Sequence, residues 1–189
     1  PGGMIGVDIF FVISGYLITA LLLREGAITG RINLFLFWKR RARRLLPAIA
    51  LLILVTGPIA LAIGGDIQVN LGRQLTGAGT FSSNWLSIFS GNDYFAQTSP
   101  ELFTNFWSLA VEEQFYLFWP LLLVAAGVIL GRRWRRFSLI IFIAIIASLT
   151  SGTVMLAFGA PISRIYYGTD THVYGLLLGV LLAFSIPWS

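Results

Sequence analysis

Long apolar runs are the feature that most constrains the fold of this chain. A transmembrane helix needs about 20 mostly apolar residues to cross a bilayer core of about 30 Å. Five runs reach or approach that length, at residues 4–23, 45–64, 103–130, 137–158 and 173–188. Because lipid offers the backbone no hydrogen-bond partners, we expect each run to be helical. The sequence therefore predicts an all-α, polytopic helical membrane protein in which residues 1–189 form one domain.

Composition supports this class and excludes others. Hydrophobic residues make up 57% of the 189 residues and charged residues 11%, whereas soluble domains are about half apolar and a quarter charged. The net charge of +5 does not indicate a nucleic-acid partner, because the basic residues gather in two short clusters between apolar runs. The absence of cysteine and the single histidine, His172, exclude disulfides, thiolate sites and histidine clusters within this chain. We expect no metal site and no permanently bound cofactor.

The basic clusters predict the orientation in the membrane. Residues 75–89 are compatible with a helix but contain glycine, threonine, serine and asparagine. We expect them to form a tilted or re-entrant helix, because a sixth span would place one basic cluster outside. With five spans, the basic residues of 24–44 and 131–136 face the same side, and an excess of lysine and arginine marks the cytoplasmic side. We therefore predict that both segments are cytoplasmic loops.

Carboxylates at membrane depth are the clearest candidates for function. An ionised carboxylate costs about 2.5–3.5 kcal/mol at a helix centre, so such groups usually face a cavity and have partners. Ser108 and Glu112 lie four residues apart on one helix face, where the pair could position an acceptor hydroxyl or relay its proton. A place in an interfacial aromatic belt is the alternative. Asp8 and Glu113 could likewise line a polar cavity. The alternative for each is an ordinary hydrated position without a functional role.

The run from Lys39 to Arg44 lies at a predicted membrane edge. It is most simply a set of charges that fix topology and bind anionic headgroups. Arg41 and Arg44 are three residues apart on one helix face and could instead hold phosphate through bidentate guanidinium contacts. A nucleotide-bearing donor such as coenzyme A (CoA) would offer those phosphates on the cytoplasmic side.

Small residues predict close helix packing. Ser14 and the glycine after it, and the Gly175-x-x-x-Gly179 pattern, would let neighbouring helices approach closely. His172 lies at the outer end of the last run with an aspartate nearby. We interpret it as an interface histidine that caps a helix, with a histidine titrating near neutrality as the alternative.

Five segments, taken in order, resemble the acyltransferase-3 family of integral-membrane O-acyltransferases. They are Pro1–Ile18, Arg40–Pro47, Asn92–Phe95, Trp107–Tyr116 and Tyr166–Thr171. Such a domain has about ten spans, and the resemblance covers about its first half without the first transmembrane helix. We therefore expect this chain to be an internal piece of a larger membrane protein.

The resemblance implies transfer of an acyl group, often acetyl, from cytoplasmic acyl-CoA to a hydroxyl of a cell-envelope glycan. Lipopolysaccharide, peptidoglycan and exopolysaccharide are typical acceptors, and the bacterial inner membrane is the usual location. Arg41 and Arg44 match the donor-side Arg-x-x-Arg pattern, and Ser108 and Glu112 match the Ser-x-x-x-Glu pattern. The predicted roles are therefore catalytic for Glu112 and Ser108, acyl-CoA phosphate binding for Arg41 and Arg44, and substrate pocket for Asp8, Ser14 and Glu113.

Two departures from the family pattern bear on catalysis. The family's main catalytic histidine is expected upstream of Pro1, and His172 is no substitute because relatives often carry arginine there. Asn105 also stands where many relatives have histidine. We therefore expect the 189-residue stretch to be inactive by itself. The alternatives are a transporter or flippase of a lipid-linked glycan, in which membrane acids mark an ion or substrate path, and a non-catalytic membrane scaffold.

Overall fold

The computed structural model describes residues 2–68, 70–90, 102–130 and 134–186. The described residues form eight α-helices and one short 3-10 turn, with no strand among them. The helices are α1 (Gly2–Thr29), α2 (Leu34–Ile63), α3 (Leu71–Thr80), α4 (Ser83–Phe89), α5 (Phe106–Leu130), α6 (Trp134–Ala157), α7 (Ile162–Tyr167) and α8 (Thr169–Ser185). The predicted all-α, polytopic helical class is confirmed.

Four helices contain segments long and apolar enough to cross a bilayer. These segments are Ile5–Thr29, Leu34–Ile63, Phe106–Leu130 and Arg135–Ala157. The fifth expected span corresponds to α8, whose 17 residues extend only about 25 Å at 1.5 Å per residue. That length falls short of a bilayer core of about 30 Å. Within the described residues, α8 is therefore not one of the four candidate spans, in line with the shorter run expected at 173–188.

The prediction of one helix over 75–89 is wrong. The chain instead forms two short helices, α3 and α4, with Phe81 between them in the left-handed region at φ 53°. The backbone N–H of Phe81 caps α3 by donating to the carbonyl of Gly77. A Cβ atom on Gly77 would lie 2.9 Å from the Cα of Ser83, so the turn requires glycine there. Neither helix is long enough to cross a bilayer.

The interpretation of residues 24–44 as a loop is also wrong. Helix α1 continues to Thr29, and α2 begins at Leu34 after a short turn. Asn33 caps α2 by accepting a hydrogen bond from the Leu36 N–H at 3.0 Å. The basic run therefore lies within a 30-residue helix. Its long side chains can consequently reach neighbouring helices.

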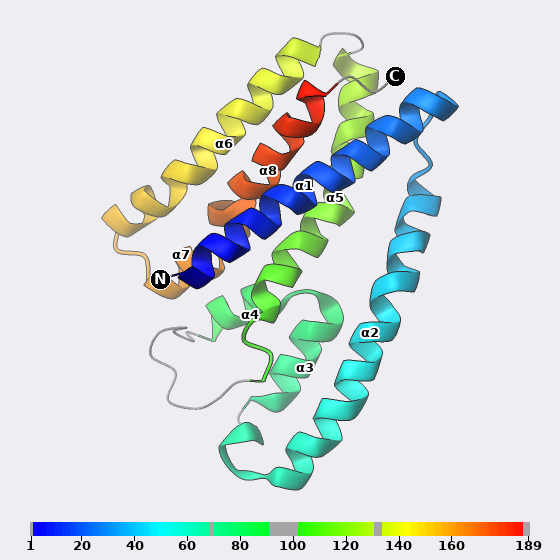
Figure 1. Ribbon diagram of the computed structural model, residues 1–189. Helices are drawn as coiled ribbons and strands as arrows, with labels where there is room; N and C mark the ends of the chain where they lie inside the picture. The colour runs from blue at the N-terminus through cyan, green and yellow to red at the C-terminus, as the bar shows by residue number, and fades with distance from the viewer. Residues whose placement is uncertain (1, 69, 91–101, 131–133, 187–189) are drawn as a thin grey trace.

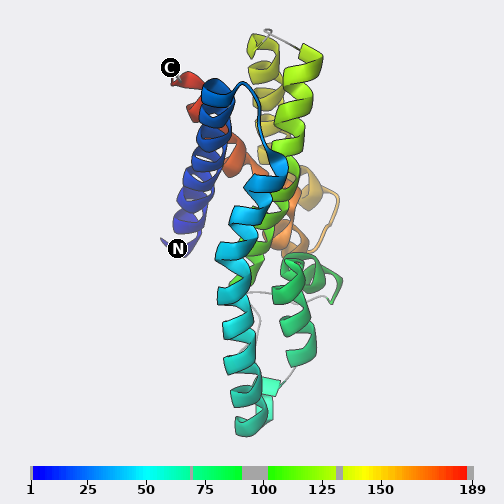
Figure 2. The ribbon, with the colours of Figure 1, turned by 90° about the vertical axis from the view of Figure 1, so that its right-hand side faces the viewer.

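The long helices pack side by side as one bundle. Figures 1 and 2 show α8 between α1 and α6, with α2 beside α5, α3 packed against α2, and α4 packed against α5 and α7. The end of α1 and the start of α6 lie at the same end of the bundle. If both basic segments face the same side of the membrane, these helix ends must lie together, as they do here. That this side is cytoplasmic stays a prediction. The motif Asn92–Phe95 lies outside the described residues.

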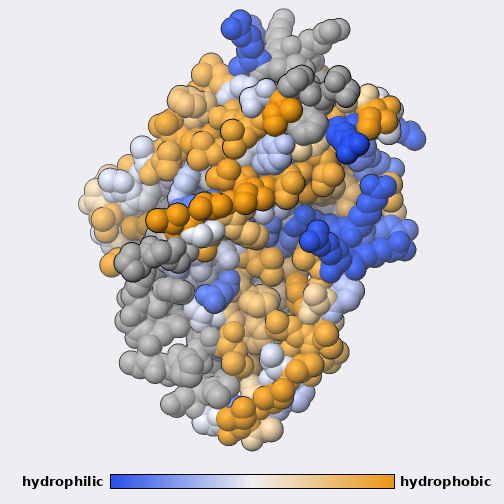
Figure 3. All heavy atoms as spheres, in the orientation of Figure 1, coloured by the Kyte–Doolittle hydropathy of each residue, from blue (hydrophilic) through white to orange (hydrophobic). Residues whose placement is uncertain are grey.

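The outer surface of the bundle suits a lipid environment. Large apolar side chains are exposed along α2 and α6, for example Leu54 and Ile140. Figure 3 shows that much of the visible face is apolar and that hydrophilic side chains gather where α1 meets α2. That junction borders the candidate site.

Glycines bring α1 and α8 into backbone contact. A Cβ atom on Gly15 would overlap the backbone of Leu176, and one on Gly179 would overlap the backbone of Val12 and Tyr16. The predicted close packing of these small residues is confirmed: α1 and α8 pack against each other. This contact fixes the rotation of α1 and hence the direction in which Ser14 points.

Gly15→Ala tests the α1–α8 contact. Because its methyl group would overlap helix backbone, we expect a loss of stability of about 1–3 kcal/mol, as for overpacked cores. Gly6→Ala is the matched control on the same helix, since a Cβ there meets nothing within 4 Å. Thermal unfolding in detergent micelles measures both. Equal melting temperatures for the two variants would contradict this account of the packing.

Candidate active site

A buried carboxylate lies where α1 and α5 meet. Glu112 on α5 is 6% exposed, and its Oε1 accepts two hydrogen bonds. Ser14 on α1 donates through Oγ at 2.5 Å, and Tyr116 donates through its hydroxyl at 2.6 Å. The Ser14 partner comes from another helix, whereas Tyr116 lies one turn further along α5. Two hydroxyl donors on one oxygen define Glu112 as a hydrogen-bond acceptor in a buried pocket.

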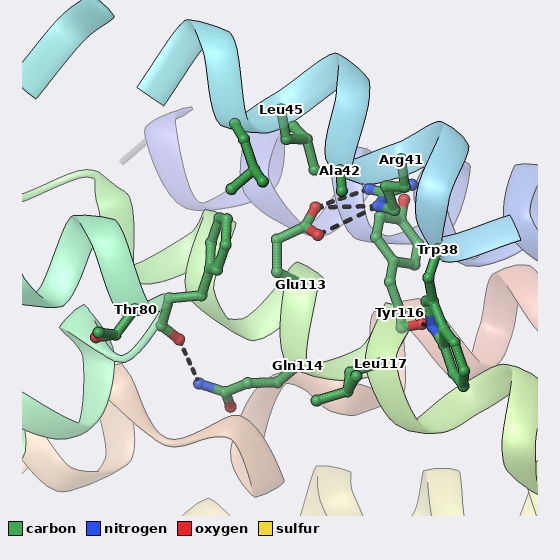
Figure 4. A pocket seen from close by; sticks show the side chains of 11 residues that line it. Trp38, Arg41, Ala42, Leu45, Thr80, Glu113, Gln114, Tyr116 and Leu117 are labelled. Atoms are coloured by element: carbon green, nitrogen blue, oxygen red, sulfur yellow. Dashed lines mark hydrogen bonds and ion pairs between the residues drawn. The ribbon is translucent and has the colours of Figure 1, made fainter. Parts of the chain in front are cut away.

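The second carboxylate faces α2. Glu113 receives hydrogen bonds from Arg41 Nε at 3.2 Å and from Arg41 Nη2 at 2.8 Å. Figure 4 shows this pair between α5 and α2. The same Nη2 lies 3.9 Å from Glu112 Oε1, and the Arg41 guanidinium carbon lies 3.1 Å from the centre of the Tyr116 ring. One guanidinium therefore contacts both carboxylates and an aromatic face.

The local sequence explains this geometry. Consecutive residues on an α-helix point about 100° apart, so Glu112 and Glu113 face different neighbours. Glu112 reaches α1, and Glu113 reaches α2. Arg41 lies within the range of α2, which runs beside α5, so its side chain can reach Glu113. Sequence analysis did not single out Tyr116, although its spacing of four residues from Glu112 could have identified it as a partner.

The structure does not bring every predicted residue together. Ser108 lies one turn before Glu112 on α5, but its hydroxyl donates to the Asn105 carbonyl at 3.1 Å. Asp8 lies nearer the start of α1 and accepts a hydrogen bond from the Tyr174 hydroxyl at 2.8 Å. The candidate site therefore centres on Ser14, Glu112, Glu113 and Arg41.

A cavity rich in arginine lies beside this cluster, between the end of α1 and the first half of α2. Its volume is about 530 Å³. Arg41 and Arg44, for which phosphate binding stays a prediction, line it, and Arg24 and Arg40 line it as well. Sequence reasoning missed the contribution of Arg24, which comes from the other helix. The turn between α1 and α2 brings these four side chains to one cavity.

A second cavity, of about 260 Å³, lies on the other side of Arg41. Apolar residues of α2 and α5 line most of it, together with Glu113 and Gln114. Gln114 Nε2 donates to the Phe81 carbonyl and to Asn84 Oδ1, each at 3.0 Å. These bonds attach the α3–α4 turn to α5. Arg41 thus lies between a charged cavity and an apolar one.

Among the residues that the structure describes, no group of three or more histidine, aspartate or glutamate side chains is placed to hold a metal ion. The chemistry available in the site is that of carboxylates, hydroxyl groups and guanidinium groups. Such a set can bind anions, hold a hydroxyl group and accept or return a proton.

Comparison with known proteins relates the whole chain to acyl transfer. The profile of the acyltransferase domain family, acyltransferase 3, matches residues 1–189. O-acetyltransferase OatA of Staphylococcus aureus strain NCTC 8325 is 43% identical over 188 residues, which cover 98% of this chain and 30% of OatA. Another protein of strain COL, named an O-acetyltransferase by inference, is 43% identical over 186 residues, 98% of this chain and 31% of that protein. The chain thus spans less than a third of these relatives. No solved structure matches it.

Arg41→Ala tests the charge balance of the cluster. The change leaves the partly buried Glu113 without its ion pair and the buried Glu112 without a nearby positive charge, so we expect a loss of about 3–5 kcal/mol in the free energy of unfolding. Denaturant unfolding in detergent micelles measures it. Arg43→Ala is the matched control, because that exposed side chain lies two residues along α2 and lines neither cavity. A loss no larger than the control's would refute the role of Arg41.

Proposed function

The chain belongs to the acyltransferase-3 family, and we propose that the protein transfers an acyl group, in the first place acetyl, from acyl-CoA to a hydroxyl of a cell-envelope glycan. The observation that carries this proposal is the arginine cavity directly beside a buried cluster of carboxylates and hydroxyls. A transferase of this kind needs an anion site for the donor and a polar pocket for the acceptor. The two features supply these from adjoining faces of α2.

The arginine cavity is the proposed donor site. Arg24, Arg40 and Arg44 receive no salt bridge from the described residues, so their guanidinium groups are available to phosphate. Acyl-CoA carries several phosphate groups, and its supply in a bacterium is cytoplasmic. We accordingly assign this end of the bundle to the cytoplasmic side of the inner membrane, which agrees with the excess of basic residues there.

The carboxylate cluster is the proposed acceptor side of the reaction. Both hydrogen bonds to Glu112 from hydroxyl groups reach Oε1, and no described residue donates to Oε2. That oxygen can accept a hydrogen bond from the acceptor hydroxyl and orient it. The hydroxyl oxygen then bonds to the thioester carbonyl carbon, the carbon–sulfur bond breaks, and CoA leaves as a thiol once the hydroxyl proton has been transferred.

A transporter of a lipid-linked glycan would also bury carboxylates in the membrane. The two functions differ in whether the donor is consumed. The full protein in proteoliposomes, supplied with acetyl-CoA and cell-wall glycan fragments, should release free CoA in proportion to the acetyl groups found on the glycan. Acyl-CoA binding without release of CoA would favour transport.

Arg44→Ala and Arg24→Ala test the donor site. Each removes a charged hydrogen-bond donor worth about 1.5–3 kcal/mol, so we expect acetyl-CoA to bind roughly 10-fold more weakly or worse. Calorimetric titration of the full protein in lipid nanodiscs measures the dissociation constant. Arg43→Ala is the control, since this side chain does not line the cavity. Unchanged affinity in Arg24→Ala and Arg44→Ala would place the donor elsewhere.

Glu112→Gln tests the acceptor pocket. The amide keeps the shape of the side chain but loses its charge and proton affinity, so we expect the turnover number to fall roughly 10²- to 10³-fold. Acetyl-CoA affinity should change little, because the donor cavity does not include Glu112, and the melting temperature shows that the variant is folded. Release of acetyl groups from radiolabelled acetyl-CoA measures turnover. Wild-type turnover in a folded Glu112→Gln protein would leave Glu112 a structural residue.

A further inference from the structure

His172 is a buried side chain that the proposed reaction does not use. It lies near the start of α8, is 8% exposed, and packs against Trp107 with ring centres 5.0 Å apart. Its Nε2 lies 2.9 Å from the backbone carbonyl oxygen of Tyr166. A carbonyl oxygen only accepts, so Nε2 must carry the hydrogen. In the neutral ring, Nδ1 is therefore the nitrogen with a free lone pair.

That lone pair has no hydrogen-bond partner among the described residues. Buried polar atoms in proteins are nearly always satisfied by protein or by water, so an orphaned acceptor points to a ligand. A small cavity adjoins the ring, with a volume of about 10 Å³, and Asp8 and Trp107 also line it. That volume corresponds to a single water-sized group.

Asp8 supplies a second acceptor at the same cavity. The Tyr174 hydroxyl donates to Asp8 Oδ1 at 2.8 Å, and no described residue donates to Oδ2. His172 and Asp8 both line this cavity, so a ligand that donates hydrogen bonds can serve the orphaned imidazole nitrogen and the carboxylate together. The cavity size restricts that ligand to one small O–H group.

We propose that Asp8 and His172 form a binding site for one hydroxyl-bearing group, whose O–H donates to His172 Nδ1 beside the Asp8 carboxylate. Water fits because its two O–H groups satisfy both acceptors at once. The second source of the same chemistry is a hydroxyl of the acyl acceptor, and only that source rests on the proposed function. The site lies about 24 Å along α1 from Arg24, at 1.5 Å per residue, and so at the far end from the donor cavity.

Nitrogen NMR of the full protein in lipid nanodiscs, with ¹⁵N-labelled histidine, tests the site directly at a pH where imidazole is neutral. His172→Gln identifies the two His172 signals by difference. We expect a protonated Nε2 and an unprotonated Nδ1 whose shift is that of a hydrogen-bonded acceptor. A protonated Nδ1, or an unprotonated Nδ1 with the shift of an unbonded nitrogen, would overturn the proposal.

Two variants sharpen the assignment. Asp8→Leu removes the second acceptor, so we expect the Nδ1 signal to move toward the unbonded position. Asp170→Asn is the matched control, because this nearby carboxylate is paired with Arg164 and does not line the cavity. The proposal would also be overturned if the Nδ1 chemical shift did not change in Asp8→Leu, or if it changed equally in Asp170→Asn.

Addition of soluble peptidoglycan fragments then distinguishes the two sources. If the Nδ1 signal moves on titration in wild type and not in Asp8→Leu, the acceptor hydroxyl occupies the site. If it keeps its hydrogen-bonded shift throughout, water is the occupant. Both results support the site, and the readout needs no acyl transfer. A failure of the proposed function therefore cannot be mistaken for a failure of this inference.

Discussion

The Arg41 side chain is the counter-charge that allows two adjacent carboxylates, one buried and one partly buried, to lie between three helices. An unpaired carboxylate in this position would carry the full cost of leaving water. Arg41 offsets that cost for Glu113 through direct hydrogen bonds and for Glu112 through its nearby charge. Because the three residues come from α2 and α5, the ion pair also holds these helices in register. The site and the packing of the bundle thus depend on the same contact.

A second constraint acts on α1. Gly15 and Gly179 let the backbones of α1 and α8 approach closely, which leaves little freedom for either helix to rotate or slide. Ser14 is adjacent to that contact and points to Glu112, and Asp8 points to Tyr174 of α8. Close packing at the glycines therefore sets the positions of these polar groups. An interface lined by leucine would hold the helices further apart and less rigidly. The two buried polar clusters inherit their geometry from one glycine contact.

The sequence predicted the features that depend on local pattern. It did not predict contacts that depend on how distant helices are rotated relative to one another. Apolar run length located the long helices, and small residues predicted a close contact. The basic run 39–44 predicts a membrane edge, but it does not reveal that α2 runs through these residues and directs Arg41 to Glu113 of α5. Ser108 was paired with Glu112 by its spacing, whereas the hydroxyl from another helix that reaches this carboxylate belongs to Ser14, 98 residues away. No spacing rule within one helix finds such a partner.

The polar groups of α1 are arranged in an order that suits a two-substrate reaction. Arg24 lies near one end of the helix, Ser14 about 15 Å from it, and Asp8 about 9 Å further, at 1.5 Å per residue. The first borders the arginine cavity, the second bonds the buried Glu112, and the third borders the His172 cavity. A phosphate-bearing donor and a hydroxyl acceptor need surroundings of different character, cationic groups for the first and hydrogen-bond acceptors for the second. In the proposed reaction, one helix that presents cationic groups at one end and hydrogen-bond acceptors at the other would hold the two substrates apart, with the Glu112 carboxylate between them.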